Sequence, residues 1–285
     1  MAIFWAVVCM VLAACNDLLF KFYARRKRSH GRFLAIIGVT WFVTACCFLR
    51  GWPEDWRATL LWGAISGFFS VGGNLLMLDA MRVLDAGVCS TIYRLNLVPV
   101  VVGAALLLGE SISPAGYAGI GCALLAVIGF IPRGGEAGFR RAAIVGFAAM
   151  VLASLMRAGM GLSYRYGFLH GAEQAWVVVI NSLFWVFGGL LYALWRESGG
   201  EDGEESAARR KLWGYGLLSG VLVAGIVLTM AASLYEGKAS VVLPIEQMSF
   251  VLTGVLGVLL LKEKMGPLKI AAVLCGAAAV LLLSR

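Results

Sequence analysis

Charged residues are scarce in this chain of 285 residues. Aspartate, glutamate, lysine and arginine make up only 14% of it, whereas a soluble globular domain carries roughly 25%. Hydrophobic residues supply 61% of the chain, and the mean hydropathy is +0.87. This composition excludes a water-soluble globule, and it predicts an integral membrane protein.

The usual signals of enzymatic chemistry are also missing. No G-x-x-x-x-G-K-[ST] segment is present to cradle phosphates, so the chain is not itself an ATP-driven pump. Only two histidines occur, His30 and His170, both expected in loops and neither in an H-E-x-x-H or serine–histidine arrangement. The seven cysteines fit small apolar residues. We therefore expect no enzyme, no metal site and no cofactor.

Long apolar runs dominate what is there. A helix needs roughly 17 to 25 apolar residues to cross a bilayer, and unpaired backbone groups are not tolerated in hydrocarbon, so such runs are expected to be helical. The runs lie at residues 2–22, 33–49, 58–80, 87–108, 114–132, 142–164, 174–195, 212–235, 239–261 and 267–283. The predicted fold class is an all-α integral membrane protein with ten transmembrane helices.

An internal repeat divides these helices into two sets of five. Residues 86–128 and 239–281 align at a fixed offset of 153, with 14 of 43 positions identical, including a shared Leu-Leu-Leu-x-Glu-x-x-x-Pro core. The predicted domains are therefore residues 1–132 and 133–285. Because five is odd, the second set enters the membrane in the opposite orientation, which is the inverted repeat of secondary transporters.

Each copy of the repeat has an apolar run, then a glutamate, then a proline, then a helix of small residues; the glutamates are Glu110 and Glu263 and the prolines Pro114 and Pro267. This pattern resembles the ten-helix, EamA-type branch of the drug/metabolite transporter superfamily. The resemblance spans the whole chain in helix count and two-fold plan, and its sharp motifs cover the last two helices of each half. It implies a fold and a transport class. It does not imply a substrate, since that family handles amino acids, other metabolites, nucleotide sugars and drugs on one scaffold.

The distribution of lysine and arginine among the loops predicts how the chain is oriented in the membrane. The odd-numbered loops carry 17 lysines and arginines and the even-numbered side only 5, so the odd loops are expected to be cytoplasmic and both termini outside. The family resemblance implies instead that both termini are cytoplasmic. We expect a multi-pass protein of the bacterial inner membrane. The net charge of +8 reflects topology and attraction to anionic membrane lipids rather than a nucleic-acid partner.

Function is expected at the polar residues inside the spans, because the membrane makes them expensive. The repeat offset superposes Tyr93 and Arg94 on Glu246 and Gln247, which presents a cation and an anion at matching depths at the repeat interface. Arginine can bind a carboxylate or phosphate through two parallel hydrogen bonds. The predicted substrate-binding residues are Tyr93, Arg94, Asn96, Arg157, Asn181, Glu246 and Gln247, and Asp17 is the candidate for proton coupling.

Structural alternatives exist for several of these residues. Arg94 could pair with Glu246, Asp17 or Asp79 as an internal lock. Asp17 could form a snorkelling pair with Lys21, one turn further along the helix.

Two asparagines and two glutamates have structural explanations of their own. Asn181, like Asn74, could make an interhelical hydrogen bond. The motif glutamates Glu110 and Glu263 are expected to cap or orient helices.

These features predict a secondary transporter that moves a small anionic or zwitterionic metabolite by alternating access. The alternatives are proton-coupled drug efflux through Asp17, a flippase of a phosphate-bearing lipid-linked substrate, and a non-transporting accessory subunit.

Overall fold

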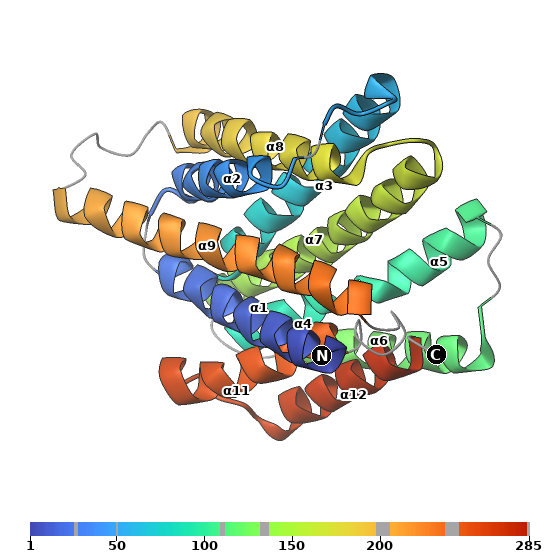
Figure 1. The fold of residues 1–285 in the computed structure, drawn as a ribbon. Helices are drawn as coiled ribbons and strands as arrows, with labels where there is room; N and C mark the ends of the chain where they lie inside the picture. Colours follow the sequence, from blue (N-terminus) through green and yellow to red (C-terminus); the bar gives the residue numbers. More distant parts are fainter. Residues whose placement is uncertain are drawn as a thin grey trace.

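The computed structural model describes residues 1–25, 28–49, 51–108, 112–131, 137–197, 206–236 and 245–283. In this part of the chain every regular element is a helix (Figure 1). The helices are α1 (Ala2–Ala24), α2 (His30–Cys46), α3 (Trp56–Ala80), α4 (Ala86–Arg94), α5 (Leu97–Leu108), α6 (Pro114–Phe130), α7 (Ala137–Leu169), α8 (Gln174–Arg196), α9 (Ser206–Glu236), α11 (Ser249–Leu261) and α12 (Pro267–Leu283).

Six of the apolar segments are long enough to cross a membrane, and four further apolar helices have 10–17 residues. The all-helical membrane fold is therefore confirmed, while the number of ten spans stays a prediction.

Local sequence accounts for where several helices begin. The Ser29 hydroxyl accepts a hydrogen bond from the Arg32 amide at 3.1 Å, and the Asp55 carboxylate accepts one from the Ala58 amide at 3.0 Å. Ser113 does the same at the start of α6, directly before Pro114. A side-chain acceptor before the first turn, or a proline within it, fits the free amides of a helix N-terminus.

Helices of the first half pack on helices of the second. The first three helices of each half are α1, α2, α3 and α7, α8, α9 in order, and the packed pairs are α1 with α9, α2 with α8, and α3 with α7. Further along, α4 packs on α11 and α6 on α12 (Figure 1). Exchanging the two halves turns the α1–α9 pair into the α7–α3 pair and leaves the α2–α8 and α6–α12 pairs unchanged, as a two-repeat fold requires.

Glycines let several of these helices approach closely. A Cβ atom at Gly67 of α3 would lie 2.6 Å from the Phe184 ring of α8, and one at Gly220 of α9 would lie 2.5 Å from Cβ of Thr40 in α2. Both glycines belong to the small-residue spacings expected at helix contacts in membranes.

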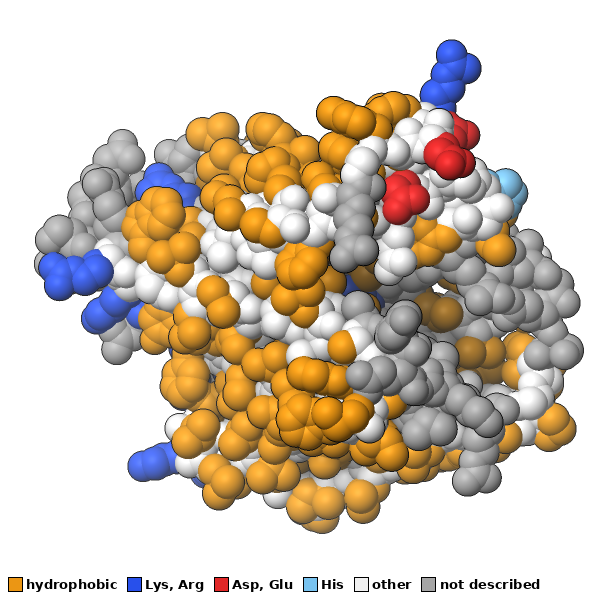
Figure 2. Space-filling view, viewed as in Figure 1, with side chains coloured by type: hydrophobic (Ala, Val, Ile, Leu, Met, Phe, Trp, Pro, Cys, Tyr) orange, Lys and Arg blue, Asp and Glu red, His pale blue; other side chains and the backbone are white. Residues whose placement is uncertain are grey.

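The described parts of three odd-numbered loops, those after α1, α3 and α11, meet at one end of the bundle, which we call the basic face. The Arg25 guanidinium donates to the Leu261 carbonyl at 3.0 Å, Arg82 donates to the Arg28 carbonyl at 3.4 Å, and Lys269 pairs with Asp85. Figure 2 shows most of the visible lysines and arginines at this end, separated by a broad hydrophobic surface from acidic side chains at the other. These contacts bring together the loops that follow α1, α3 and α11, and the assignment of this end to the cytoplasm stays a prediction.

The predicted span 87–108 is not one continuous helix, which corrects the sequence-based expectation. It divides between α4 and α5 at Leu95 and Asn96. Pro99 has no amide proton to donate to the Leu95 carbonyl, and its ring crowds that oxygen. The carbonyl accepts instead from the Val98 amide at 3.0 Å.

Candidate substrate-binding site

The second half has a helix break at the equivalent position. A turn at Met248 separates residues 245–247 from α11, and the Val251 amide donates to the Met248 carbonyl at 2.9 Å. Adding the offset of 153 to Leu95 and Val98 gives Met248 and Val251, so both halves carry the same tightened turn. Interrupted helices at the repeat interface are where transporters of this plan place substrate sites.

Arg94 and Asp17 face each other beside the first break. A guanidinium nitrogen of Arg94 lies 3.9 Å from Oδ2 of Asp17, which is 5% exposed. The same carboxylate oxygen accepts hydrogen bonds from Ser90 of α4 at 2.5 Å and from Thr253 of α11 at 3.4 Å. Asp17 therefore joins α1, α4 and α11, and it links the two halves.

Glu246 of the second half lies close enough to Arg94 for the two charges to interact. It is buried, and its carboxylate accepts a hydrogen bond from Ser233 of α9. Arg94 thus interacts with an acid of the first half and with an acid of the second.

Arg157 supplies a second cation from near the middle of α7. Its guanidinium carbon lies 5.9 Å from the centre of the Tyr93 ring, and one nitrogen donates to the Met160 sulfur at 3.4 Å. The Tyr93 hydroxyl in turn accepts from Asn74 of α3 at 3.2 Å. Among the described residues, Arg157 makes no ion pair within 4.0 Å.

Three buried polar atoms near the breaks have no hydrogen-bond partner among the described residues. They are Nε of Arg94, Oε1 of Gln247 and Oγ of Ser249. Arg94 and Gln247 are equivalent by the repeat offset. Because an unpaired polar atom inside a membrane protein is costly, these atoms mark a place suited to a polar ligand.

The structure brings together Asp17, Tyr93, Arg94, Arg157 and Glu246, and with Gln247, which follows Glu246 in the chain, we call these residues the central site. Asn96 is buried in the break itself. The pairing of Arg94 with Asp17, one of the internal locks expected from the sequence, is confirmed at 3.9 Å.

Asn181 does not join this group. It is fully buried in α8, and its side-chain amide donates to Ser66 and to the Gly63 carbonyl of α3, at 2.8 and 3.3 Å. These contacts confirm the interhelical hydrogen bond that the sequence offered as its alternative role.

The expected snorkelling pair of Asp17 and Lys21 is wrong. Lys21 is buried, and its ammonium donates to the carbonyls of Met81, at 2.8 Å, and Leu84. It thus satisfies the carbonyl of the residue that caps α3 and a second carbonyl in the loop between α3 and α4. Asp17 faces the central site instead.

The expectations for His30 and for an Arg94–Asp79 pair are also wrong. His30 is fully buried in the first turn of α2, and its Nδ1 lies 3.0 Å from an Asp79 oxygen. The other Asp79 oxygen accepts from the Tyr192 hydroxyl at 2.7 Å. Asp79 therefore belongs to a network at the basic face.

Glu263 acts as a helix cap, as predicted, but across the repeat interface. Both of its carboxylate oxygens accept from the Ala86 amide, at 2.9 and 3.1 Å, at the first residue of α4. Burial raises the pKa of the Glu263 carboxyl above its ordinary value. Glu110, its equivalent in the first half, lies outside the described residues.

Sequence reasoning missed the hydroxyls of the central site, which belong to Ser90, Ser233 and Thr253. A serine or threonine inside a helix can bond its own backbone carbonyl four residues earlier. Its presence in a span therefore does not distinguish a ligand of a buried acid from a solitary residue.

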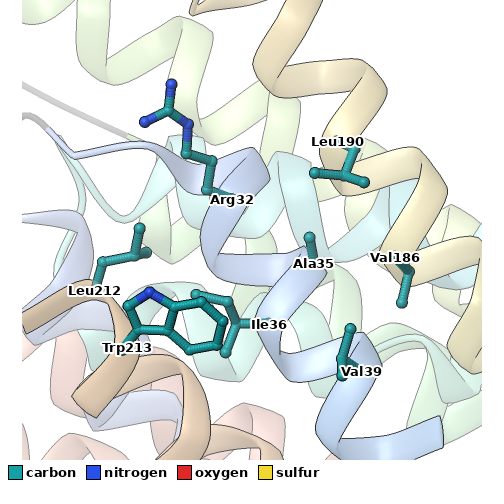
Figure 3. A pocket seen from close by; sticks show the side chains of 8 residues that line it. All are labelled: Arg32, Ala35, Ile36, Val39, Val186, Leu190, Leu212 and Trp213. Carbon is teal, nitrogen blue, oxygen red and sulfur yellow. The ribbon is translucent and has the colours of Figure 1, made fainter. Parts of the chain in front are cut away.

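The groove between α2, α8 and α9 has a different character. It encloses about 320 Å³, and every lining residue except Arg32 is apolar. Figure 3 shows the Arg32 guanidinium turned away from the other labelled side chains. This groove offers a polar solute almost nothing to bind.

Comparison with known proteins places this fold in a class. The family model described as the EamA-like transporter family matches residues 1–131 and 144–285. The class is that of membrane transporters of small solutes, and the chain belongs to the EamA-like transporter family.

One solved structure, titled only "Crystal structure of protein", is similar over 100% of this chain and 97% of its own, with a TM-score of 0.65 and 18% sequence identity. That likeness supports the fold. No curated protein matches the chain.

Proposed function

We propose that this protein is a secondary transporter that moves a small anionic or zwitterionic metabolite through the central site. The observation that carries the proposal is Arg157. It is a cation near the middle of a long apolar helix, and among the described residues its guanidinium contacts a thioether and an aromatic ring. An arginine held this way in a membrane is suited to a carboxylate or phosphate group of a ligand.

The charges of the site favour a zwitterion over a simple anion. Arg94 is already paired with Asp17, so Arg157 is left to bind the anionic group of the substrate. Glu246 interacts with Arg94 and accepts a hydrogen bond from a neutral serine, so it can receive an amine. A ligand with one group of each sign matches this arrangement.

Alternating access follows from the two-repeat plan. We infer that residues 1–132 and 133–285 form the two halves, that the chain makes ten spans, and that the halves rock about the central site in a bacterial inner membrane. Contacts between the halves at the basic face, such as Lys269 with Asp85 and Glu263 with the Ala86 amide, would hold that face closed.

Proton-coupled efflux of a cationic drug is the second candidate. Asp17 favours it, because a nearly fully buried carboxylate that bridges α1, α4 and α11 could bind a proton in exchange for a cation. Its pairing with Arg94 disfavours it, since a cationic drug would have to displace a fixed charge.

A ligand screen separates these functions. The thermal unfolding midpoint of the purified protein is measured with amino acids, organic acids, nucleotides, sugar phosphates and lipophilic cations, because a ligand that binds only the folded state raises the midpoint. An anionic or zwitterionic ligand whose effect is lost in Arg157→Gln supports the proposal. A cationic ligand that raises the midpoint of the wild type but not of Asp17→Asn supports efflux. If no ligand of the panel raises the midpoint, a flippase or an accessory subunit is favoured.

A further inference from the structure

A second cavity lies at the basic face between the ends of α3, α7 and α8, and none of the residues that line it belongs to the central site. It encloses about 700 Å³. Its charged and polar wall is formed by Asp79, Arg82, Arg141, Tyr192, Arg196 and Glu197.

Both carboxylates in this wall already accept hydrogen bonds from neighbouring groups. Asp79 accepts hydrogen bonds from His30 and Tyr192, as described above. One oxygen of Glu197 accepts from the His30 amide at 2.7 Å and from the Gly31 amide at 3.4 Å, while the other accepts from the Ser29 hydroxyl. These carboxylates therefore anchor the start of α2.

The three arginines have guanidinium N–H groups left to donate to a ligand. Arg82 uses one nitrogen on His30, at 3.3 Å, and another on the Arg28 carbonyl. Arg141 and Arg196 are both exposed, and neither forms an ion pair with another described residue. Guanidinium groups suit phosphate because they present parallel N–H donors to its oxygens.

The remaining wall of the cavity is apolar and runs deeper into the bundle. Leu76 lies one turn before Ala80 on α3, and Val145 and Ala149 lie one and two turns beyond Arg141 on α7. A ligand that fills both parts needs an anionic head and an apolar body.

We propose that this cavity binds the phosphate group of an anionic membrane lipid, held by Arg82, Arg141 and Arg196, with the acyl chains against α3 and α7. Basic pockets between transmembrane helices are suited to anionic headgroups. A free phosphate ion shares the headgroup chemistry but lacks the apolar body.

The full-length protein in an uncharged detergent is titrated with phosphatidylglycerol, phosphatidylcholine or inorganic phosphate, and the thermal unfolding midpoint reports binding. The variants are Arg141→Gln and Arg196→Gln. The matched control is Arg140→Gln, because Arg140 is exposed and adjacent on α7 but does not line the cavity.

We expect phosphatidylglycerol to raise the midpoint more than phosphatidylcholine. Each cavity variant should raise the apparent dissociation constant for phosphatidylglycerol roughly fivefold, whereas the control should keep a value near that of the wild type. A midpoint raised by inorganic phosphate, and lost in the same two variants, supports the phosphate site with a soluble source. Equal responses to both lipids with none to phosphate, or equal losses in Arg140→Gln and Arg141→Gln, would overturn the proposal.

Discussion

At the scale of single residues, Arg157 decides what the central site can bind. Its guanidinium can grip a carboxylate with two parallel hydrogen bonds, whereas a lysine ammonium acts as a point charge. We predict that Arg157→Lys weakens binding of an anionic or zwitterionic ligand roughly tenfold, which corresponds to about 1.4 kcal/mol, and that Arg157→Gln abolishes it.

The binding assay is a ligand titration followed by the unfolding midpoint. Arg57→Gln is the control, since Arg57 is an exposed arginine in the first turn of α3, at the end of the bundle opposite to the basic face. Equal affinity in the wild type and Arg157→Lys would contradict a forked contact.

Asn181, unlike Arg157, is expected to contribute to stability and not to ligand binding. It bonds Ser66 and the Gly63 carbonyl between α8 and α3, so Asn181→Ala should lower the free energy of unfolding by about 0.6 to 2 kcal/mol and leave ligand affinity unchanged. Unfolding midpoints with and without ligand measure both quantities. A loss of affinity at unchanged stability would return Asn181 to the binding site.

Polar residues in the spans could be found from the sequence because the membrane makes them conspicuous, but their partners could not. The spacing of one turn suggested that Asp17 pairs with Lys21. In the fold, Lys21 donates to the carbonyl that caps α3, and Asp17 pairs with Arg94. Partners on other helices depend on how each helix is rotated, and a uniformly apolar span carries little information about its rotation.

At the scale of helices, predicted span ends fall close to observed ones where proline or a capping side chain marks the boundary. The predicted span 267–283 coincides with α12, and 114–132 differs from α6 by two residues. The break at Leu95 has a local cause in Pro99. The break at Met248 has no proline at the equivalent position, which is Leu252, so nothing in its local sequence predicted it.

The cap that Glu263 places on α4 makes stability depend on pH. Burial raises the pKa of this carboxyl, so the folded state holds its proton to a higher pH than the unfolded chain does. Its contribution to stability is present below the ordinary pKa of about 4.3, and it is lost as pH rises through the folded-state value.

Glu263→Gln keeps an oxygen that can accept from the Ala86 amide, but it cannot ionise. We predict that the stability of the wild type relative to this variant falls as pH rises from about 4 to 7. Unfolding midpoints of both proteins across this range measure the difference. Parallel curves would show that the carboxyl is not buried as described.

At the scale of the whole molecule, the internal repeat predicted the two-half plan because it preserves a charge and a proline in register. It could not show that the halves are joined through charged groups at one face. Those contacts pair residues far apart in the chain, for example Lys269 with Asp85 and Glu263 with Ala86.

This joined face gives a test of movement between the halves. Cys89 is fully buried in α4, one turn beyond the amide that Glu263 caps. Lys269→Gln removes a partly exposed ion pair worth up to about 1 kcal/mol, so the face should open more often. We predict that a maleimide labels Cys89 roughly two to five times faster in this variant.

Peptide mass spectrometry separates Cys89 from the other cysteines. Lys264→Gln is the control, because Lys264 lies near the same loop with an exposed side chain and no ion pair to another described residue. Equal labelling in Lys269→Gln and Lys264→Gln would mean that the pair does not hold the face closed.

The central claim, that a small solute crosses the membrane through the site around Arg157, is tested most directly by counterflow in proteoliposomes, with the ligand found in the thermal screen. We predict that the wild type and Arg57→Gln exchange labelled ligand across the bilayer, and that Arg157→Gln, inserted in equal amount, loses this exchange. Wild-type exchange by Arg157→Gln would contradict the account and move the transport route away from the central site.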